Sequence, residues 1–233
     1  MITDLKNLWQ EAFRESGDGF FENGFSQARF RRLYGTDGLA GAVYWFDVTW
    51  EGRKYAYIYG LATAKAYRNQ GYGKRLMNQT HQQLRRQGYA GVILVPASRE
   101  LFGYYEKMGY TDLCSVSEFT CAAAGSIPAK PLTGKEYFSL RPTDAVNQES
   151  CLSYLQSYAS FWTGEGWMLC GLIHENKLYV QEFLGDPDLA PAITASLGAK
   201  EGFFRMRGDG RPFAMYYPLT DAPKPTYFGI AMD

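Results

Sequence analysis

The stretch Ala62-Thr63-Ala64-Lys65-Ala66-Tyr67-Arg68-Asn69-Gln70-Gly71-Tyr72-Gly73-Lys74 places an Arg-x-x-Gly-x-Gly loop between a predicted strand and a predicted helix. The strand, residues 54–63, is rich in aromatic and apolar residues and lies between turn residues. The helix, residues 73–87, carries apolar side chains at spacings of three to four and stops at Gly88. The loop therefore presents the unpaired N–H groups of a helix start, whose partial positive charge favours a bound anion.

The composition of this loop suits a phosphate group. Gly71 and Gly73 lack the Cβ atoms that would hold a phosphate away from the backbone, and Arg68 and Lys74 add positive charge. Two other glycine-rich phosphate templates do not match, because Leu76 replaces a third glycine and no Ser or Thr follows Lys74. Since Gly-x-Gly turns are common, an ordinary tight turn is the alternative.

A second motif follows the helix. Residues 91–96 form a buried-strand run that stops at a proline, and residues 98–108 form a short amphipathic helix that Gly109 closes. Upstream, we expect helical residues 5–25 with a break near 16–19, and then strands. Those strands are residues 28–34, a hairpin of 38–49 and 53–63 turning at 50–52, and, after the second motif, a last strand at 113–122.

With both motifs in place, the chain resembles the GCN5-related N-acetyltransferase (GNAT) superfamily. The signature of that superfamily joins an Arg/Gln-x-x-Gly-x-Gly/Ala loop to a later Phe-Tyr-x-Lys-x-Gly-Phe helix. The matching residues here are Arg68, Gly71 and Gly73, and then Tyr104-Tyr105-Glu106-Lys107-Met108-Gly109-Tyr110. The resemblance covers residues 1–123 and implies an α/β fold of the α+β type, a mixed sheet with helices on both faces.

Residues 124–135, rich in Ala, Gly, Pro, Ser and Lys, are predicted to be a linker. Residues 136–233 repeat the element order, with strands at 137–141, 167–173, 177–184, 202–207, 213–218 and 227–232 and helices at 148–161 and 189–197. In place of the glycine loop stands Gly185-Asp186-Pro187-Asp188-Leu189-Ala190-Pro191, whose aspartates repel a pyrophosphate. We expect a second, smaller and degenerate GNAT-like domain without a cofactor site; an unrelated α+β accessory domain is the alternative.

Composition excludes several classes of partner. The 233 residues carry a formal net charge of zero with no Lys/Arg run, which gives nucleic acid or an anionic membrane no electrostatic support. No apolar stretch is long enough to span a membrane and the N-terminus lacks a signal-peptide core, so the cytoplasm is the expected location. Four cysteines without a Cys-x-x-Cys pair and two histidines predict no metal site and no nucleophilic thiol.

The resemblance implies acetyl-coenzyme A (acetyl-CoA) as co-substrate. By position, Leu61, Ala62 and Thr63 supply backbone groups to its pantetheine arm and an N–H to the thioester oxygen. The resemblance also implies that the pyrophosphate is bound by Arg68, Asn69, Gln70, Gly71, Tyr72, Gly73 and Lys74. Tyr105 matches the tyrosine that meets the cofactor sulfur. A thiol pKa near ~8.5 lies below a phenol near ~10, so a hydrogen bond to the departing thiolate describes its role better than full proton transfer. A core aromatic is the alternative.

The general base is not evident, because residues 54–63 carry no carboxylate. Asp47, Glu51, Glu22 and Glu118 are candidates acting through a water, and each is more typically a solvated charge. The amine proton can also leave along a water chain. The apolar stretch 227–232 leads to the chain-terminal carboxylates of Asp233, which some tandem members of the superfamily use near the acceptor.

The acceptor is predicted only by class. Early aromatic residues stand where the resembled fold builds its acceptor wall, although they are equally compatible with a core: Phe20, Phe21, Phe25, Tyr44, Trp45, Phe46 and Trp50. With Asp18 and Glu22 nearby, a cationic small molecule with an apolar body is expected. The leading interpretation is direct acetyl transfer to the primary amine of a small molecule. A protein amine acetyltransferase and a non-catalytic acyl-CoA sensor or assembly protein are the alternatives, and a homodimer is compatible with each.

Overall fold

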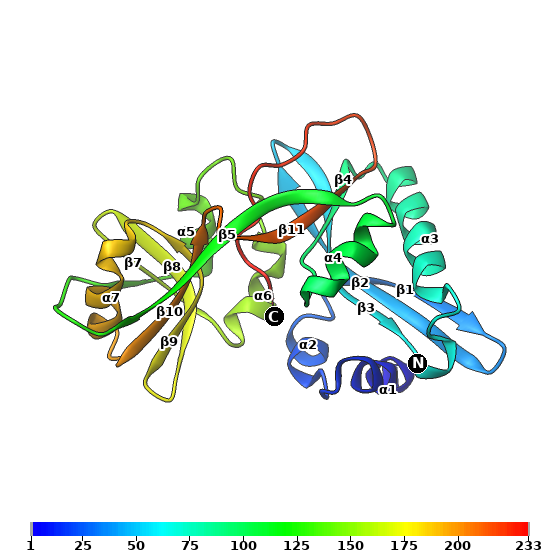
Figure 1. The fold of residues 1–233 in the computed structure, drawn as a ribbon, viewed down its shortest axis with the longest axis horizontal. Coiled ribbons are helices and arrows are strands. Elements are labelled where there is room, and N and C mark those ends of the chain that lie inside the picture. Colours follow the sequence, from blue (N-terminus) through cyan, green and yellow to red (C-terminus); the bar gives the residue numbers. More distant parts are fainter. Residues whose placement is uncertain (1, 233) are drawn as a thin grey trace. The chain divides into compact units, whose positions relative to one another are not determined.

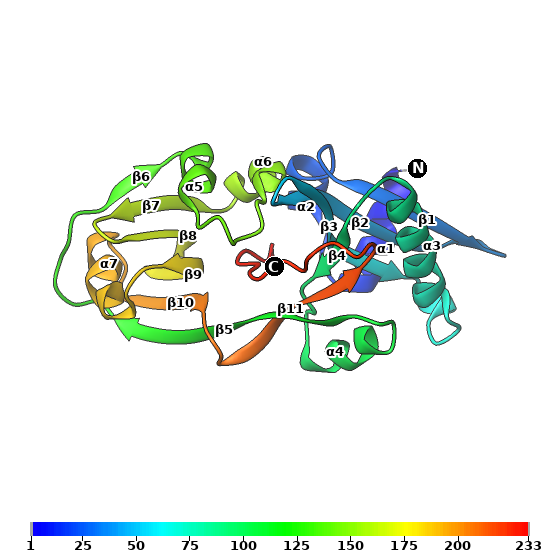
Figure 2. The same cartoon turned by 90° about the horizontal axis from the view of Figure 1, so that it is seen from above.

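The computed structural model describes residues 2–232, which fold into two compact units. The first unit contains the chain up to Thr111 together with Met215–Lys224, and the second contains Asp112–Ala214 together with the chain from Pro225 onward. Figures 1 and 2 show the elements of each unit. The unit boundary thus falls at 111/112, and the chain later returns to the first unit. The predicted limits of 1–123, 124–135 and 136–233 stay a prediction about which segments fold independently.

The first unit is built on a mixed sheet. Strands β1, β2 and β3 are antiparallel, β4 is parallel to β3, and the end of β11 is antiparallel to β4. The β2–β3 hairpin forms where it was predicted, because Glu51 and Gly52 both adopt positive φ angles (47° and 69°), as a type I′ turn requires. The bounds are Arg29–Gly35, Gly38–Trp50, Arg53–Thr63, Gly91–Leu94 and, for β11, Arg211–Pro218.

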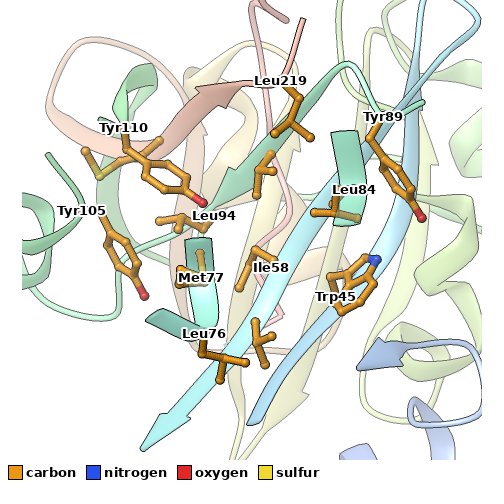
Figure 3. Close-up of a cluster of buried hydrophobic side chains, with 14 of the residues drawn as sticks. Trp45, Ile58, Leu76, Met77, Leu84, Tyr89, Leu94, Tyr105, Tyr110 and Leu219 are labelled. Atoms are coloured by element: carbon orange, nitrogen blue, oxygen red, sulfur yellow. The ribbon is translucent and has the colours of Figure 1, made fainter. Parts of the chain in front are cut away.

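Helices cover both faces of this sheet (Figure 1). Successive side chains of β2 point to opposite faces of the sheet. Trp45 therefore joins the core cluster that contains Leu76, whereas Tyr44 packs edge-on against Trp9 at 5.5 Å between ring centroids. Figure 3 shows the cluster that contains Trp45, to which the returning chain contributes Leu219. The helices are α1 (Ile2–Phe13), α2 (Asp18–Asn23), α3 (Tyr72–Arg86) and α4 (Arg99–Glu106), with a 3-10 turn η1 at Lys65–Tyr67.

The second unit holds a sheet in the order β5-β10-β9-β8-β7-β6. Strands β9 and β10 are parallel, and the other neighbouring pairs are antiparallel. The strands are β5 (Thr111–Ala122), β6 (Lys130–Leu132), β7 (Ser160–Gly164), β8 (Trp167–His174), β9 (Lys177–Leu184) and β10 (Glu201–Arg207); the helices are α5 (Gly134–Leu140), α6 (Leu152–Gln156) and α7 (Ala190–Ser196), with 3-10 turns η2 (Glu149–Cys151) and η3 (Pro187–Leu189).

Three predicted elements in this half are wrong. Residues 137–141 lie in and just after helix α5, because Thr133 and Glu136 form a capping box that starts a helix. The predicted helix 148–161 ends early, because Phe161 pairs across the sheet with Leu132 and Cys170. Residues 227–232 make one isolated bridge, from Ala145 to Tyr227, and no strand. The predicted strand 213–218 forms, but its end pairs with β4 in the first unit.

A buried ion pair holds the chain end within the second unit. Glu182 and Arg141 are almost wholly buried and joined by two contacts, Nη2 to Oε1 at 2.6 Å and Nε to Oε2 at 2.8 Å. Tyr137 donates to the same carboxylate at 2.6 Å. Gly229 lies against it so closely that a Cβ there would come 1.6 Å from Glu182 Oε1. Gln148 also donates to the Ile230 carbonyl at 2.7 Å. At Ile230, a side chain thus takes the place of a neighbouring strand as the hydrogen-bond partner of the backbone.

No helix in residues 2–232 is both long and apolar enough to cross a membrane. Within the same residues, no group of three or more His, Cys, Asp or Glu side chains is arranged to hold a metal ion.

Candidate functional site

The last part of β3 has an open edge. Parallel pairing with β4 joins Tyr55–Ile58 to Gly91–Leu94 and then stops, whereas β3 continues to Thr63 along β2. At the same point the register with β2 shifts, so that Tyr59 is an extra, bulged residue. In the described part of the chain, no strand pairs with the β4 side of β3 beyond Ile58. That edge can accept an extended ligand as an added strand.

The register decides which peptide groups point to this edge. The Ala64 N–H donates to the Ala40 carbonyl at 2.9 Å, so residues 64 and 40 are a hydrogen-bonded pair of the antiparallel ladder. Hydrogen-bonded pairs alternate along such a ladder, which turns the Ala62 peptide groups toward Ala42. Leu61 therefore presents its N–H and C=O groups to the open edge, and Thr63 presents its N–H group there, while the Thr63 carbonyl accepts from Arg68. The expectation that Ala62 also supplies backbone groups is corrected by this alternation.

The glycine loop has the geometry of an anion cradle. Gly71 stands in the left-handed region (φ 79°) as the N-cap of α3, and the Arg75 N–H is the first to reach a helical acceptor, the Gly71 carbonyl at 2.9 Å. The N–H groups of Tyr72, Gly73 and Lys74 precede that bond and have no acceptor one turn back. A Cβ at Gly71 would meet nothing within 4 Å, so space for a ligand remains there.

Tyr67 and Gln70 anchor the loop from within. The buried Tyr67 accepts a hydrogen bond from the Asp37 N–H at 2.9 Å through its hydroxyl, and Gln70 donates to the Ala66 carbonyl at 2.7 Å. Asn69 is exposed with a positive φ of 61°. The chain is thus held in one path between β3 and α3.

Arg68 turns toward the backbone. Its Nε donates to the Thr63 carbonyl at 3.1 Å and its Nη2 to the Glu11 carbonyl at 3.3 Å. The Glu11 carboxylate in turn accepts from the Lys65 N–H. Glu11 was missed from sequence, because nothing in helix 2–13 signals a tertiary contact with a loop far along the chain. It ties α1 to the end of β3.

Tyr105 lies on α4 at the edge of the core cluster beside Tyr110 (Figure 3). Its side chain is 8% exposed, and its ring contacts Tyr104 at 5.2 Å and Tyr110 at 5.6 Å between centroids. Burial, with the neighbouring Tyr104, raises the pKa of the Tyr105 phenol, so the group stays protonated. Within residues 2–232 no protein group hydrogen-bonds to its hydroxyl. The ring is part of the core, and the hydroxyl keeps its hydrogen.

The carboxylates considered as bases are engaged or distant. Asp47 accepts hydrogen bonds from Tyr89 at 2.5 Å and Arg29 at 3.0 Å and pairs with Lys54 at 2.9 Å. Burial opposes ionisation, but these partners together lower the pKa of the Asp47 carboxyl. Asp47 also faces Ala56, about 16 Å from Leu61 at ~3.3 Å per residue.

The structure favours none of the other carboxylates as a general base. Hydrogen bonding from Arg211, and then from Arg205, lowers the pKa of Glu118 to about 2. Glu51 occupies the exposed β2–β3 turn, and Glu22 is exposed on α2. Asp233 lies outside the described residues.

The expected aromatic acceptor wall is mostly core. Phe25 alone of the seven is partly exposed; the others are between 0% and 7% exposed, namely Phe20, Phe21, Tyr44, Trp45, Phe46 and Trp50. Aromatic rings of α1 and α2 cover Tyr44 and Phe46, and Trp9 stacks on Phe20 at 4.9 Å. Trp45 lies in the core cluster on the other face of the sheet. A wall built of these rings is therefore a wrong prediction, with Phe25 as the exception.

The second unit lacks the features of this site in its described residues. Its parallel strands stay paired, Glu201–Phe204 with Lys177–Val180 and again Met206 with Phe183, so β9 has no comparable open edge. The Asp186 carboxylate accepts from the Asp188 N–H at 3.0 Å. An aspartate thus occupies the turn where a pyrophosphate would need positive charge.

Comparisons with known proteins find one family model and several similar folds. Residues 1–112 match the family model of an acetyltransferase (GNAT) domain. Three solved structures share the fold at low identity. A conserved protein of unknown function from Enterococcus faecalis V583 has 18% identity and a TM-score of 0.69, over 94% of this chain and 70% of that one. A GCN5-related N-acetyltransferase from Anabaena variabilis has 15% identity and a TM-score of 0.67, over 94% and 70%.

A tandem GNAT protein from the clavulanic acid biosynthesis pathway is the third, with 12% identity, a TM-score of 0.52 and coverage of 94% of both chains. A search of the curated proteins returned no match. The chain thus matches an acetyltransferase (GNAT) domain over residues 1–112 and has a GNAT-like fold.

Proposed function

We propose that the protein transfers an acetyl group directly from acetyl-CoA to the primary amine of a small molecule. The observation that carries the proposal is the open edge of β3 followed at once by the glycine loop that starts α3. An extended arm and a pyrophosphate need these two features in this order. The second unit, which lacks both, is proposed to be a GNAT-like partner domain without a cofactor site.

The residues present fit such a co-substrate. The pantetheine arm would pair with Leu61 and Thr63, and one of their N–H groups would polarise the thioester carbonyl. The pyrophosphate would meet the free N–H groups at the start of α3, with charge from Arg68 and Lys74 and with Asn69 and Gln70 shaping the loop. When bound, the co-substrate supplies an activated acetyl group and a thiolate leaving group.

Tyr105 is proposed to hydrogen-bond the departing thiolate. Its raised pKa argues against complete proton transfer, because a thiol is the stronger acid, yet it keeps the phenol in its donating form. The attacking amine must lose a proton, and the paired states of Asp47 and Glu118 leave a water chain or the Asp233 carboxylates as its route. The Asp233 route remains a prediction.

Calorimetric titration of the purified protein with acetyl-CoA tests the proposal. We expect one site per chain, followed by acetylation of members of a small-amine panel. No binding would overturn the proposal, and two sites would overturn the assignment of an empty second unit. Lysine peptides as better acceptors than small amines would point to a protein amine acetyltransferase instead. Cytoplasmic location and a homodimer stay predictions on which the proposal does not depend.

The Tyr105→Phe variant separates an enzyme from a sensor. The substitution removes one hydroxyl that has no protein partner, so folding and acetyl-CoA affinity should be unchanged. We expect turnover to fall by roughly ten-fold or more, since stabilisation of a leaving group acts in the transition state. Acetyl-CoA binding without turnover of any amine by the wild-type protein would favour the non-catalytic sensor.

A further inference from the structure

Tyr104, the neighbour of Tyr105 on α4, places its hydroxyl at the glycine loop. A Cβ built on Gly73 would lie 2.8 Å from the Tyr104 hydroxyl and 3.3 Å from Thr63 Oγ1. Three elements therefore meet at one point: the end of β3, the first turn of α3 and the middle of α4. The absence of a side chain at Gly73 makes room for this approach.

The Tyr104 hydroxyl is a donor without a protein acceptor. The side chain is 38% exposed, and within residues 2–232 no hydrogen bond ends at its oxygen. Desolvation raises the pKa of the Tyr104 phenol, so the hydrogen is retained at neutral pH. Contact with the Tyr105 ring at 5.2 Å between centroids, with the planes at 71°, limits where the Tyr104 ring can turn.

The position of this donor defines its acceptor. The peptide N–H groups of Tyr72, Gly73 and Lys74 start α3 with no helical acceptor, and the hydroxyl lies beside the middle one of these residues. An anion with several oxygens, such as a phosphate, can accept from the helix start and from a phenol at once. A thioester carbonyl belongs at the peptide groups of β3 instead.

We propose that Tyr104 is a cofactor-binding residue that donates a hydrogen bond to a phosphate oxygen of acetyl-CoA at the first turn of α3. The inference rests on the proposed function, since it names a further contact of the same co-substrate. The adjacent tyrosines then have separate tasks: Tyr105 faces the sulfur, and Tyr104 holds the phosphates. Tyr104 thereby favours acyl donors that carry the phosphates over donors that carry only the pantetheine arm.

Calorimetry with acetyl-CoA on the wild type, Tyr104→Phe and Tyr105→Phe tests the assignment. A hydrogen bond to a charged group contributes enough that its loss should raise the Kd of Tyr104→Phe by about ten-fold. Tyr105→Phe is the matched control: it loses the same atom from the next residue of the helix and should keep the wild-type Kd. Circular dichroism melting of each variant verifies that folding is unchanged.

A truncated donor locates the contact. With S-acetylpantetheine, which lacks the phosphates, wild type and Tyr104→Phe should have the same kcat/KM, whereas acetyl-CoA should separate them by about ten-fold. An equal loss with both donors, or an unchanged Kd for acetyl-CoA in Tyr104→Phe, would overturn the inference and leave the proposed function intact. Failure of the wild type to bind acetyl-CoA would instead remove the proposed function itself.

Discussion

His81 and Tyr110 form a buried hydrogen-bonded pair next to Tyr105. The His81 Nε2 and the Tyr110 hydroxyl are 2.8 Å apart, and the Tyr217 ring stacks on the imidazole at 4.2 Å between centroids. Burial, with a smaller effect of Arg85, lowers the pKa of His81 to about 4. The imidazole is therefore neutral at pH 7 and serves packing around the α3–α4 junction; it is no base for the amine.

This pair makes stability depend on pH in a defined window. Because the pKa of His81 is lower in the folded state than in the unfolded state, the unfolded chain gains a proton first as pH falls below about 6.5. The stability from keeping His81 neutral is complete above that pH and decreases toward pH 4. We expect a loss of about 3 kcal/mol in the free energy of unfolding between pH 7 and pH 4 from this residue alone.

Urea unfolding of the wild type and His81→Gln across pH 4–7 measures that loss. Between pH 7 and pH 4, the free energy of unfolding of the variant should fall less than that of the wild type, by the contribution of His81. This difference is expected whatever the stability of the variant at pH 7. His174→Gln is the control, because the His174 side chain is 68% exposed, and its curve should run parallel to that of the wild type. Parallel curves for His81→Gln and the wild type would show that His81 is not held neutral by the fold.

At the scale of elements, β3 is a strand with two kinds of peptide group in its last five residues. Thr63 faces the open edge and Ala62 faces β2, so proline, which lacks the N–H group, should act differently at the two positions. Thr63→Pro should weaken acetyl-CoA binding at least ten-fold with a modest effect on stability. Ala62→Pro should lower the melting temperature markedly, because it breaks the ladder with Ala42.

Calorimetry and thermal unfolding of the two variants test the register directly. The pattern must be crossed: one variant loses mainly affinity and the other mainly stability. If both variants lose the same stability, the alternation assigned to the end of β3 is incorrect. If Thr63→Pro keeps full affinity, the co-substrate does not pair with this edge.

The elements that could be predicted from sequence are those with local causes. The β2–β3 hairpin follows from alternating apolar residues around Glu51-Gly52, and α3 from its spacing and from Gly71 and Gly88 at its ends. The strand expected at 137–141 failed although the Thr133–Glu136 capping box was present in the sequence. The helix expected through Phe161 failed for a tertiary reason, because pairing across the sheet overrides apolar spacing.

The candidate site divides in the same way. The loop Arg68–Lys74 is contiguous, so sequence alone predicts it, and which groups of Leu61 and Thr63 face outward needs only the register. Glu11 and Tyr104 reach the loop from elements far away in sequence, and no local pattern reports such contacts. The burial of Phe20 and Tyr44 likewise depends on how α1 and α2 pack on the sheet.

At the scale of the whole molecule, the order of the chain ties the two units together. The first unit is completed by Met215–Lys224, a segment that the chain supplies only after building most of the second unit. Met215 is fully buried in the core cluster and pairs with Leu94, while Arg85 donates to the Leu219 carbonyl at 2.9 Å. The Leu219 and Thr220 N–H groups also donate to the Ala90 carbonyl, and the Tyr55 hydroxyl donates to the Pro223 carbonyl at 3.0 Å.

A fragment of residues 1–123 should therefore not fold by itself. Removing β11 exposes β4 as an unpaired apolar edge, and it removes two or three buried side chains at roughly 1.5–3 kcal/mol each. That sum is comparable to the whole stability of a small domain, about 5–15 kcal/mol. We expect the fragment to aggregate or to lack a cooperative melting transition.

A matched fragment in which a flexible linker joins residues 1–123 to residues 211–224 should melt cooperatively and bind acetyl-CoA, because β11 can then pair with β4 again. Cooperative melting and acetyl-CoA binding by residues 1–123 alone would instead make the boundary predicted from sequence the true folding limit, with β11 only an addition to a complete domain.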